Sequence, residues 1–329
     1  MASGRALWFA GPRSMAVRPE QLPPLRDGQV LVRTSFSGIS GGTEMLAYRG
    51  ELDPELPVDE TIGVLGGTFR FPFRYGYSCV GVVEESRADL AEGELVFAFH
   101  PHQDCFVAAA GDLIALGPVD ARRATLFPLV ETALQIALDA GPLLGETVVV
   151  LGLGAVGALS ALMLERAGAH VLAVEPRRWR RAALDGLGVE TTAPEDLREA
   201  LTARGRSVPL VVEASGNPEA LRTTFGLLSH EGTVLVASWY GNKEVCLPLG
   251  HDFHRRRLSI RSTQVSTIPA HLGNRWNRES RCRAVVDLLG ELPLDRFATH
   301  TFPFESAGDA YAAIDAGTEG LIHAALGYG

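Results

Sequence analysis

VVVLGLGAVG, residues 148–157, decides how the second half of this chain folds. Four apolar residues typical of a buried strand lead into a G-x-G-x-x-G pattern that opens an apolar helix. In such a unit Gly152 permits a tight turn, Gly154 lets a pyrophosphate approach the backbone, and Gly157 lets the helix pack closely on the strand. The stretch therefore predicts a dinucleotide-binding strand–turn–helix unit.

The residues around this loop predict the remaining contacts to the dinucleotide. The backbone N–H groups of Ala155 and Val156, at the helix N-terminus, should face the phosphates. Glu175 ends the next predicted strand about 20 residues on, where a carboxylate binds the adenosine ribose. A carboxylate repels a 2′-phosphate, so Glu175 favours NAD(H). The arginines within 177–181 form either a solvated helix face or, at Arg180, a contact to adenine or phosphate, which keeps NADP(H) possible.

From residue 147 onward, predicted strands alternate with predicted helices. The strands are 147–151, 170–174, 210–213 and 233–237, and the helices are 155–167, 177–187 and 218–228. This alternation predicts a parallel sheet with helices on both faces, which binds its ligand at the carboxyl ends of the strands. The turns after the last two strands should therefore flank the dinucleotide, through Ser215, Gly216, Ser238, Trp239 and Tyr240. Trp239 and Tyr240 could instead be aromatic residues that pack in the core.

The chain on either side of this region has a different pattern. Short apolar strands at 30–34, 76–85 and 94–99 are separated by Gly- and Pro-rich loops, which is typical of a barrel or sandwich. A helix at 124–140 ends at Gly141-Pro142. The C-terminal part predicts helices at 281–289 and 307–316 and strands at 297–302 and 322–326. We predict an α/β protein with a β-rich domain, residues 1–125 completed by 267–329, and a doubly wound Rossmann domain, residues 126–266.

Composition narrows the partners and the compartment. The chain carries 30 Lys and Arg against 39 Asp and Glu, a formal net charge of -9, so neither nucleic acid nor an anionic membrane is expected as the main partner. The four cysteines are scattered, as expected of free thiols in a reducing cytosol. The uncharged stretch 147–164 is interrupted by glycines and fits the strand–turn–helix unit better than a membrane span. We expect a cytoplasmic protein with a small-molecule substrate.

Taken together, the β-rich first domain, the glycine loop, the acidic strand end and the E-A-S-G turn at 213–216 resemble the medium-chain dehydrogenase/reductase (alcohol dehydrogenase-like) superfamily over nearly the whole chain. The segments that resemble the branch containing bacteriochlorophyllide a dehydrogenase are 37–44, 253–258, 264–265, 275–276, 299–300 and 303–304. That branch acts on a hydroxyethyl substituent in pigment biosynthesis. The resemblance implies a GroES-like catalytic domain and NAD(P)-dependent hydride transfer. It also implies a homodimer formed at an edge strand, for which 245–249 is a candidate.

The same resemblance exposes a departure from the family. Classical members bind catalytic zinc through a Cys, a His and a third Cys or Glu. Here Ser40 stands at the Cys position, Tyr77 at the His position, and Phe127–Pro128 at the third. The lobe that holds a four-Cys structural zinc is missing, since only Cys105 occurs between 94 and 117. Zinc needs three or four ligands, so we expect no metal at either site.

His100, His102 and Asp104 form an H-x-H-x-D pattern that offers another set of metal ligands, because alternate residues of a strand share one face. A polar loop or cleft rim is the favoured interpretation. No metal is therefore predicted here either.

Without zinc, another group must stabilise the negative charge that develops on a carbonyl oxygen. Tyr77 is the candidate donor, because a phenol donates well to a developing alkoxide. Ser40 and Thr43 are candidates for the proton relay, the family pattern placing a hydroxyl near Thr43. Glu131, within 130–133, is a carboxylate in an otherwise apolar helix. It would orient a donor or act as a base, or else be a structural acid.

The expected reaction is zinc-independent oxidation of a secondary alcohol, or reduction of a ketone, in specialised or pigment metabolism. Reduction of an enone or a quinone is one alternative, since zinc-free members often reduce conjugated double bonds. A non-catalytic, cofactor-binding sensor is the other.

Overall fold

The computed structural model describes residues 3–205 and 207–329, which form two compact units. One unit comprises Met1–Pro128 and Cys282–Gly329, and the other Leu129–Arg281. The sequence placed the divisions at 125/126 and 266/267. Residues 267–281 belong instead with the second unit, where the Arg281 guanidinium bonds Glu131 and Gln135.

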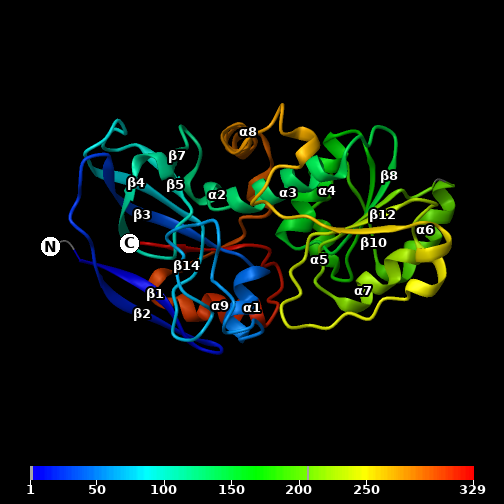
Figure 1. Cartoon of the computed structure of the whole chain (residues 1–329), viewed down its shortest axis with the longest axis horizontal. Coiled ribbons are helices and arrows are strands. Elements are labelled where there is room, and N and C mark those ends of the chain that lie inside the picture. The colour runs from blue at the N-terminus through cyan, green and yellow to red at the C-terminus, as the bar shows by residue number, and fades with distance from the viewer. Residues whose placement is uncertain (1–2, 206) are drawn as a thin grey trace. The chain divides into compact units, whose positions relative to one another are not determined.

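The second unit is built on a six-stranded, all-parallel sheet (Figure 1). Its strand order is β10-β9-β8-β11-β12-β13. The strands are β8 (Thr147–Leu151), β9 (His170–Val174), β10 (Glu190–Thr192), β11 (Leu210–Glu213), β12 (Thr233–Val236) and β13 (Ser259–Ser262). The order reverses between β8 and β11, which is the switch point of a doubly wound sheet. The predicted Rossmann-type α/β domain is confirmed.

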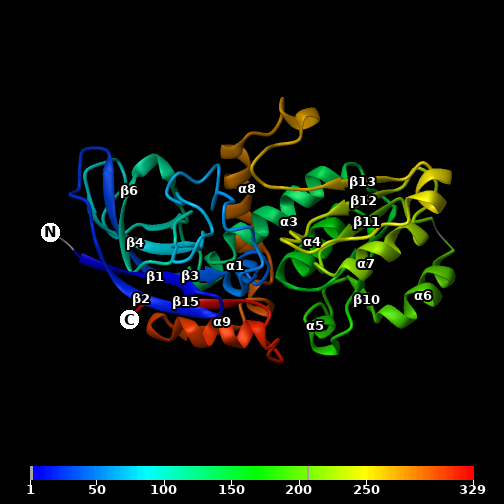
Figure 2. The ribbon, with the colours of Figure 1, turned by 60° about the horizontal axis from the view of Figure 1, so that its bottom comes forward.

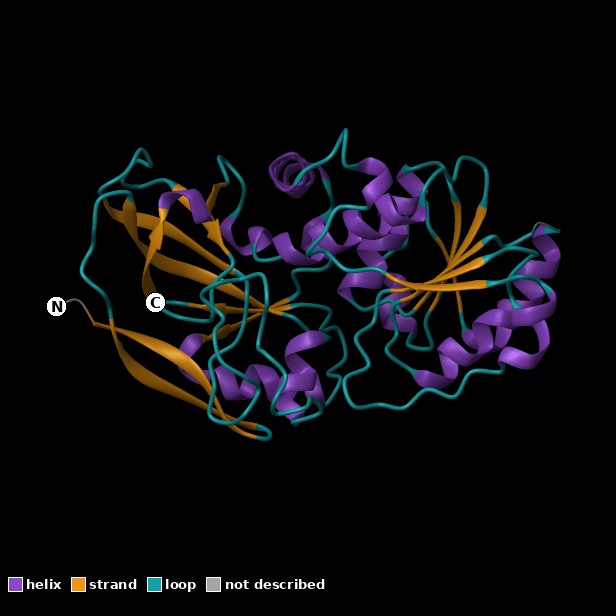
Figure 3. Ribbon diagram, in the orientation of Figure 1, coloured by secondary structure: helices purple, strands orange, loops and turns teal. Residues whose placement is uncertain are grey.

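Helices cover both faces of this sheet (Figure 3). They are α3 (Phe127–Ala140), α4 (Ala155–Arg166), α5 (Arg178–Ala182), α6 (Leu197–Arg204) and α7 (Pro218–Thr223). All five residues of β8 are buried, and α4 buries Gly157 to Leu164 against the sheet. Helix α5 is shorter than the predicted 177–187, because a turn structure replaces helix after Ala182.

The first unit is β-rich, as predicted (Figure 2). Its main sheet has the order β14-β15-β3-β4-β5-β7, with β6 also paired to β3. These strands are β3 (Gln29–Ile39), β4 (Cys79–Ser86), β5 (Leu95–Ala98), β6 (Cys105–Ala109), β7 (Leu113–Ala115), β14 (His300–Pro303) and β15 (Ala324–Gly327). The C-terminal strand β15 pairs directly with β3, which completes the GroES-like domain from the far end of the chain.

Several elements of the first unit were not predicted, among them β6 and β7. A hairpin of β1 (Ser3–Gly11) and β2 (Ser14–Gln21) precedes the main sheet, and helix α1 (Thr43–Arg49) follows β3. The remaining helices, α2 (Ala121–Ala124), α8 (Arg278–Glu291) and α9 (Ala307–Asp315), overlap predicted ones except for α2. An aromatic cluster joins these pieces: the ring centroids of Phe9 and Tyr311 lie 5.5 Å apart, and those of Tyr48 and Tyr311 lie 5.3 Å apart.

The edge-strand prediction for 245–249 is wrong. This segment forms no strand, and β13 lies at that edge of the sheet instead. Val245 and Leu247 pack against the core of the second unit, so their apolar character serves packing rather than strand pairing. Within residues 3–205 and 207–329, none of the helices combines the length and the hydropathy that crossing a membrane requires.

Candidate functional site

The glycine loop after β8 is closed by contacts that only glycine permits. Gly152 has φ +91°, and a Cβ there would lie 2.7 Å from the Cα of Ser215. A Cβ on Gly157 would lie 1.9 Å from the carbonyl oxygen of Gly152. Gly154 differs, because a Cβ there would meet no atom of the protein within 4 Å. The first and third glycines therefore serve packing, and the second leaves open space at the N-terminus of α4, as a phosphate requires.

Glu175 lies behind this loop with its side chain almost fully buried. One carboxylate oxygen accepts a hydrogen bond from the Leu153 N–H at 3.0 Å, and the other accepts one from the Arg177 N–H at 3.0 Å. Arg180 Nη1 lies 3.6 Å from the same carboxylate. Each oxygen keeps a further lone pair, so Glu175 can hold the loop and still accept a ribose hydroxyl.

The arginines after Glu175 do not form a uniformly solvated face. Arg181 donates to the carbonyl oxygens of Glu175 and Pro176 at 2.6 and 3.0 Å. Arg180 stacks over the Trp179 ring at 5.1 Å, and its Nε is buried with no hydrogen-bond partner among the described residues. Burial lowers the pKa of Arg180, although Glu175 opposes that effect. Arg180 is thus a partly buried cation whose Nε–H group can still donate a hydrogen bond.

The turns after β11 and β12 are tied together. The buried carboxylate of Glu213 accepts from the Ser215 N–H at 2.7 Å and from the Gly216 N–H at 3.0 Å. The Gly216 N–H also donates to Ser238 Oγ at 2.8 Å. Three of the predicted cofactor residues therefore belong to one hydrogen-bonded turn pair at the carboxyl ends of parallel strands.

The two aromatic residues that follow Ser238 lie in different environments. Trp239 is 42% exposed. Tyr240 packs against the core of the second unit, and burial, together with Glu213, raises the pKa of its phenol well above the usual value. These contacts favour the packing alternative for Tyr240. They leave Trp239 as the side chain exposed at this turn.

Three of the four predicted catalytic residues come together in the first unit. Ser40 precedes α1, Thr43 is the first residue of α1, and Tyr77 lies just before β4. Burial raises the pKa of Tyr77 to about 12, Glu44 adds to the rise, and hydrogen bonds to Ser40 and Thr43 oppose it. The hydroxyls of Ser40, Thr43 and Tyr77, called the hydroxyl set below, thus lie close together, and Tyr77 stays a protonated donor at neutral pH.

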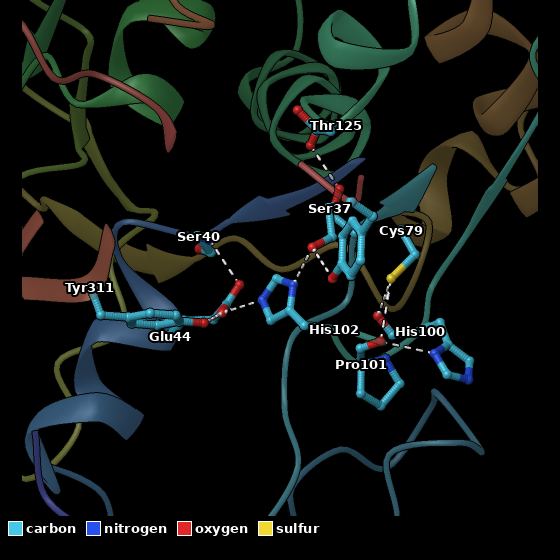
Figure 4. Close-up of polar contacts among 11 residues, drawn as sticks. Ser37, Ser40, Glu44, Cys79, His100, Pro101, His102, Thr125 and Tyr311 are labelled. Carbon is cyan, nitrogen blue, oxygen red and sulfur yellow. Dashed lines mark hydrogen bonds and ion pairs between the residues drawn. The ribbon is translucent and has the colours of Figure 1, made fainter. Parts of the chain in front are cut away.

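Next to Ser40 lies a buried polar network that the sequence did not predict (Figure 4). His102 Nε2 lies 2.9 Å from Glu44 Oε2, and His102 Nδ1 lies 2.7 Å from Ser37 Oγ. Glu44 also accepts from the Ser40 N–H at 2.8 Å and from the Tyr311 hydroxyl. The only sequence signals were the acid that follows Thr43 and the His-x-His pattern, and nothing in the spacing linked the two.

The first unit does not fit a zinc site. Ser40 and Tyr77 supply hydroxyls, and Phe127 and Pro128 supply no ligand. His102 faces Glu44 and Ser37, His100 bonds the Pro101 carbonyl, and the carboxylate of Asp104 pairs with Arg5. In the part of the chain that is described, no three His, Cys, Asp or Glu side chains gather closely enough to hold a metal ion. The three side chains of the H-x-H-x-D pattern therefore have different partners and do not converge on one metal position.

Glu131, the fourth predicted catalytic residue, belongs to the second unit. Its carboxylate pairs with the Arg281 guanidinium at 3.0 Å, and both side chains are at most 5% exposed. Arg281 also donates to Gln135 and to the Val265 carbonyl, both at 2.6 Å. Burial raises the pKa of Glu131, while Arg281 opposes that effect. This geometry supports a structural ion pair more than a base.

Comparison with known proteins agrees with the fold and the glycine loop. The family model described as "Zinc-binding dehydrogenase" matches residues 155–284, which begins at α4. The 2-desacetyl-2-hydroxyethyl bacteriochlorophyllide A dehydrogenase of Cereibacter sphaeroides is 25% identical, with 93% of each chain covered. The D-guloside 3-dehydrogenase of Escherichia coli K12 is 23% identical over 93% of this chain and 95% of that protein. These relatives are dehydrogenases, and the chain has the fold of the medium-chain dehydrogenase/reductase superfamily.

A solved structure of low identity supports the fold of this enzyme. An alcohol dehydrogenase from Escherichia coli CFT073, crystallised with NADH, superposes with a TM-score of 0.78 at 16% identity and covers 99% of this chain and 100% of that one. The family match begins after the candidate zinc positions at Ser40, Tyr77 and Phe127–Pro128. The family match therefore covers part of the dinucleotide-binding unit and does not include Ser40, Thr43 or Tyr77.

The contrast between Gly154 and Gly157 gives a test of the loop. We expect Gly154→Ala to leave the unfolding midpoint unchanged while weakening dinucleotide binding at least tenfold, because its methyl group would occupy the open space meant for phosphate. Gly157→Ala should lower the melting temperature by several degrees, because its methyl group would overlap the Gly152 carbonyl. Thermal unfolding and cofactor titration measure both. Equal effects of the two substitutions on stability would contradict this assignment.

Proposed function

We propose that this enzyme transfers a hydride between a nicotinamide dinucleotide and a secondary alcohol or ketone, with a hydroxyl group in the role that zinc has in classical members. The observation that carries the proposal is that the hydroxyls of Tyr77, Ser40 and Thr43 lie close together. The family resemblance places two metal ligands at Ser40 and Tyr77 and the proton relay near Thr43. The donors present suit a developing alkoxide and do not suit a tetrahedral metal ion.

The second unit fits a dinucleotide. The glycine loop and the N-terminus of α4 would hold the pyrophosphate, and Glu175 would hold the adenosine ribose. The turns at Ser215, Gly216 and Ser238, with Trp239, would line its nicotinamide end. When bound, the reduced cofactor supplies the hydride.

The hydroxyl set would stabilise the negative charge on the substrate oxygen and supply its proton. Tyr77 would donate a hydrogen bond to the substrate oxygen as negative charge grows on that oxygen. Ser40 and Thr43 would pass the proton to the phenol oxygen as the alkoxide is neutralised. Because Tyr77 has a pKa of about 12, the donor form persists through the ordinary working range of pH.

Three further features belong to the same proposal. The substrate is a small secondary alcohol or ketone of specialised or pigment metabolism, in keeping with relatives that dehydrogenate a hydroxyethyl pigment precursor and a guloside. The enzyme acts as a cytoplasmic homodimer. Strand β13, which lies at the edge of its sheet and is exposed along its length, supports pairing there.

Substitution of Tyr77 by Phe tests the role of the hydroxyl. The change keeps the ring and removes the donor, so turnover should fall by roughly 10²–10³-fold, the usual loss for one oxyanion donor. Cofactor affinity should stay within about twofold, because Tyr77 belongs to the other unit. Steady-state kinetics with a ketone and an enone, together with cofactor titration, measure both. Near-normal turnover by Tyr77→Phe would make the residue a pocket wall, and enone reduction alone would change the reaction class.

The relative affinity for NADH and NADPH tests whether Glu175 or Arg180 determines cofactor preference. NADH should bind more tightly than NADPH by roughly 1–3 kcal/mol, the cost of a mismatched buried charge or hydrogen bond. Glu175→Gln should reduce this difference in binding free energy. Arg180→Gln should increase it, because NADPH binding would become weaker. Arg198→Gln, on an exposed face of α6, is the matched control. Calorimetric titration gives the affinity of each of the four proteins for NADH and for NADPH. A wild-type preference for NADPH would mean that the arginine outweighs the carboxylate.

A further inference from the structure

The buried network around Glu44 is larger than packing alone requires. Glu44, His102, Ser37 and Tyr311 all have no solvent exposure. They come from four separate pieces of the first unit: α1, the loop before β6, β3 and α9. Burying a carboxylate and an imidazole costs several kcal/mol unless every polar atom is satisfied. A buried polar network with this many satisfied partners, next to Ser40, calls for a functional explanation.

The hydrogen bonds fix the roles of the two central groups. Three donors converge on Glu44: the Ser40 N–H at one oxygen, and the Tyr311 hydroxyl and His102 Nε2 at the other. A carboxylate only accepts, so Nε2 carries a proton. The second nitrogen, Nδ1, meets Ser37 Oγ at 2.7 Å, and Ser37 continues to the Tyr328 hydroxyl at 2.8 Å. Glu44 is therefore anchored from three directions.

Two connections lead from Glu44 to the hydroxyl set. The first is mechanical, because its bond to the Ser40 N–H at 2.8 Å fixes the backbone turn that carries Ser40 into Thr43 and α1. The second is electrostatic, because the carboxylate is the largest charge that acts on the Tyr77 phenol and disfavours its ionisation.

In the described part of the chain, the groups that act on Tyr77 are acids and phenols. The titratable groups facing Tyr77 are Glu44 from α1, Asp59 from the segment after it, Tyr75 on its own segment and Tyr311 from α9. None of these is a lysine or an arginine. The environment therefore keeps the phenol hydroxyl protonated, which is the form that can donate.

We propose that Glu44, anchored by His102 and Tyr311, is the positioning residue of the Tyr77 site, holding Ser40 and Thr43 in place and keeping Tyr77 a hydrogen-bond donor. The inference rests on the proposed function for its catalytic consequence. Its physical content, that Glu44 controls the Tyr77 hydroxyl, does not depend on any substrate.

Glu44→Gln tests the proposal with the smallest change of shape. The variant should lose turnover by roughly 10–100-fold, the order observed when a residue that orients a reactive group is removed. Its cofactor affinity should be unchanged. Glu51→Gln, a partly buried acid just after α1, is the matched control and should keep full turnover.

A double variant separates positioning from folding. If Glu44 acts through the Tyr77 hydroxyl, Glu44→Gln combined with Tyr77→Phe should be no slower than Tyr77→Phe alone. A multiplied loss in the double variant would overturn the proposal, because Glu44 would then act independently of Tyr77. Glu44→Asp, which keeps the charge, should retain more turnover than Glu44→Gln.

A second readout needs no substrate. The ionisation of Tyr77 can be followed by tyrosinate absorbance as the difference between the protein and its Tyr77→Phe variant, in the presence and absence of Glu44→Gln. We expect Tyr77 to ionise at lower pH once the carboxylate is gone. Unchanged ionisation would refute the proposal even if the enzyme is fully active. A shift without any turnover on ketones or enones would uphold it while rejecting the proposed function.

Discussion

The approach of the Gly157 Cα to the Gly152 carbonyl is the constraint on which the dinucleotide unit depends. A methyl group at Gly157 would lie 1.9 Å from that oxygen, so α4 can begin directly after β8 only with glycine at this position. The same approach brings Ser215, from the next strand of the sheet, against Gly152. The tight turn therefore orders the carboxyl edge of the sheet, and the bonds from Glu175 and Glu213 hold the neighbouring loops to it.

In the proposed mechanism, the first unit must hold a hydroxyl donor in position without a metal. In zinc enzymes the ion supplies both the positive charge and the geometry. Here the proposed donor, Tyr77, lies beside Ser40 and Thr43, and the buried Glu44 accepts a hydrogen bond from the Ser40 N–H. The phenol is a weaker electrophile than zinc. Its advantage is that a protonated group with a pKa of about 12 needs no ligand set and no control of metal loading.

Local pattern predicted the second unit well, because the period of apolar residues and the glycine spacing act over short distances. Strand β8, helix α4 and the acidic Glu175 followed from 28 consecutive residues, 148–175. The first unit was predicted less completely. Its hairpin and α1 lack a strong period, and the pairing of Glu44 with His102 joins residues 58 positions apart through tertiary packing. The prediction of an edge strand at 245–249 failed because apolar character alone does not distinguish an edge strand from a loop that packs on the core.

The central claim is that the carbonyl oxygen is stabilised by protein hydroxyls rather than by zinc. The most direct test is turnover measured on protein whose metal content has been reduced by chelation and quantified by mass spectrometry. The account predicts that chelated, metal-poor enzyme keeps its full rate and that added zinc does not raise it. Loss of turnover on chelation, restored by one equivalent of zinc per chain, would contradict the account.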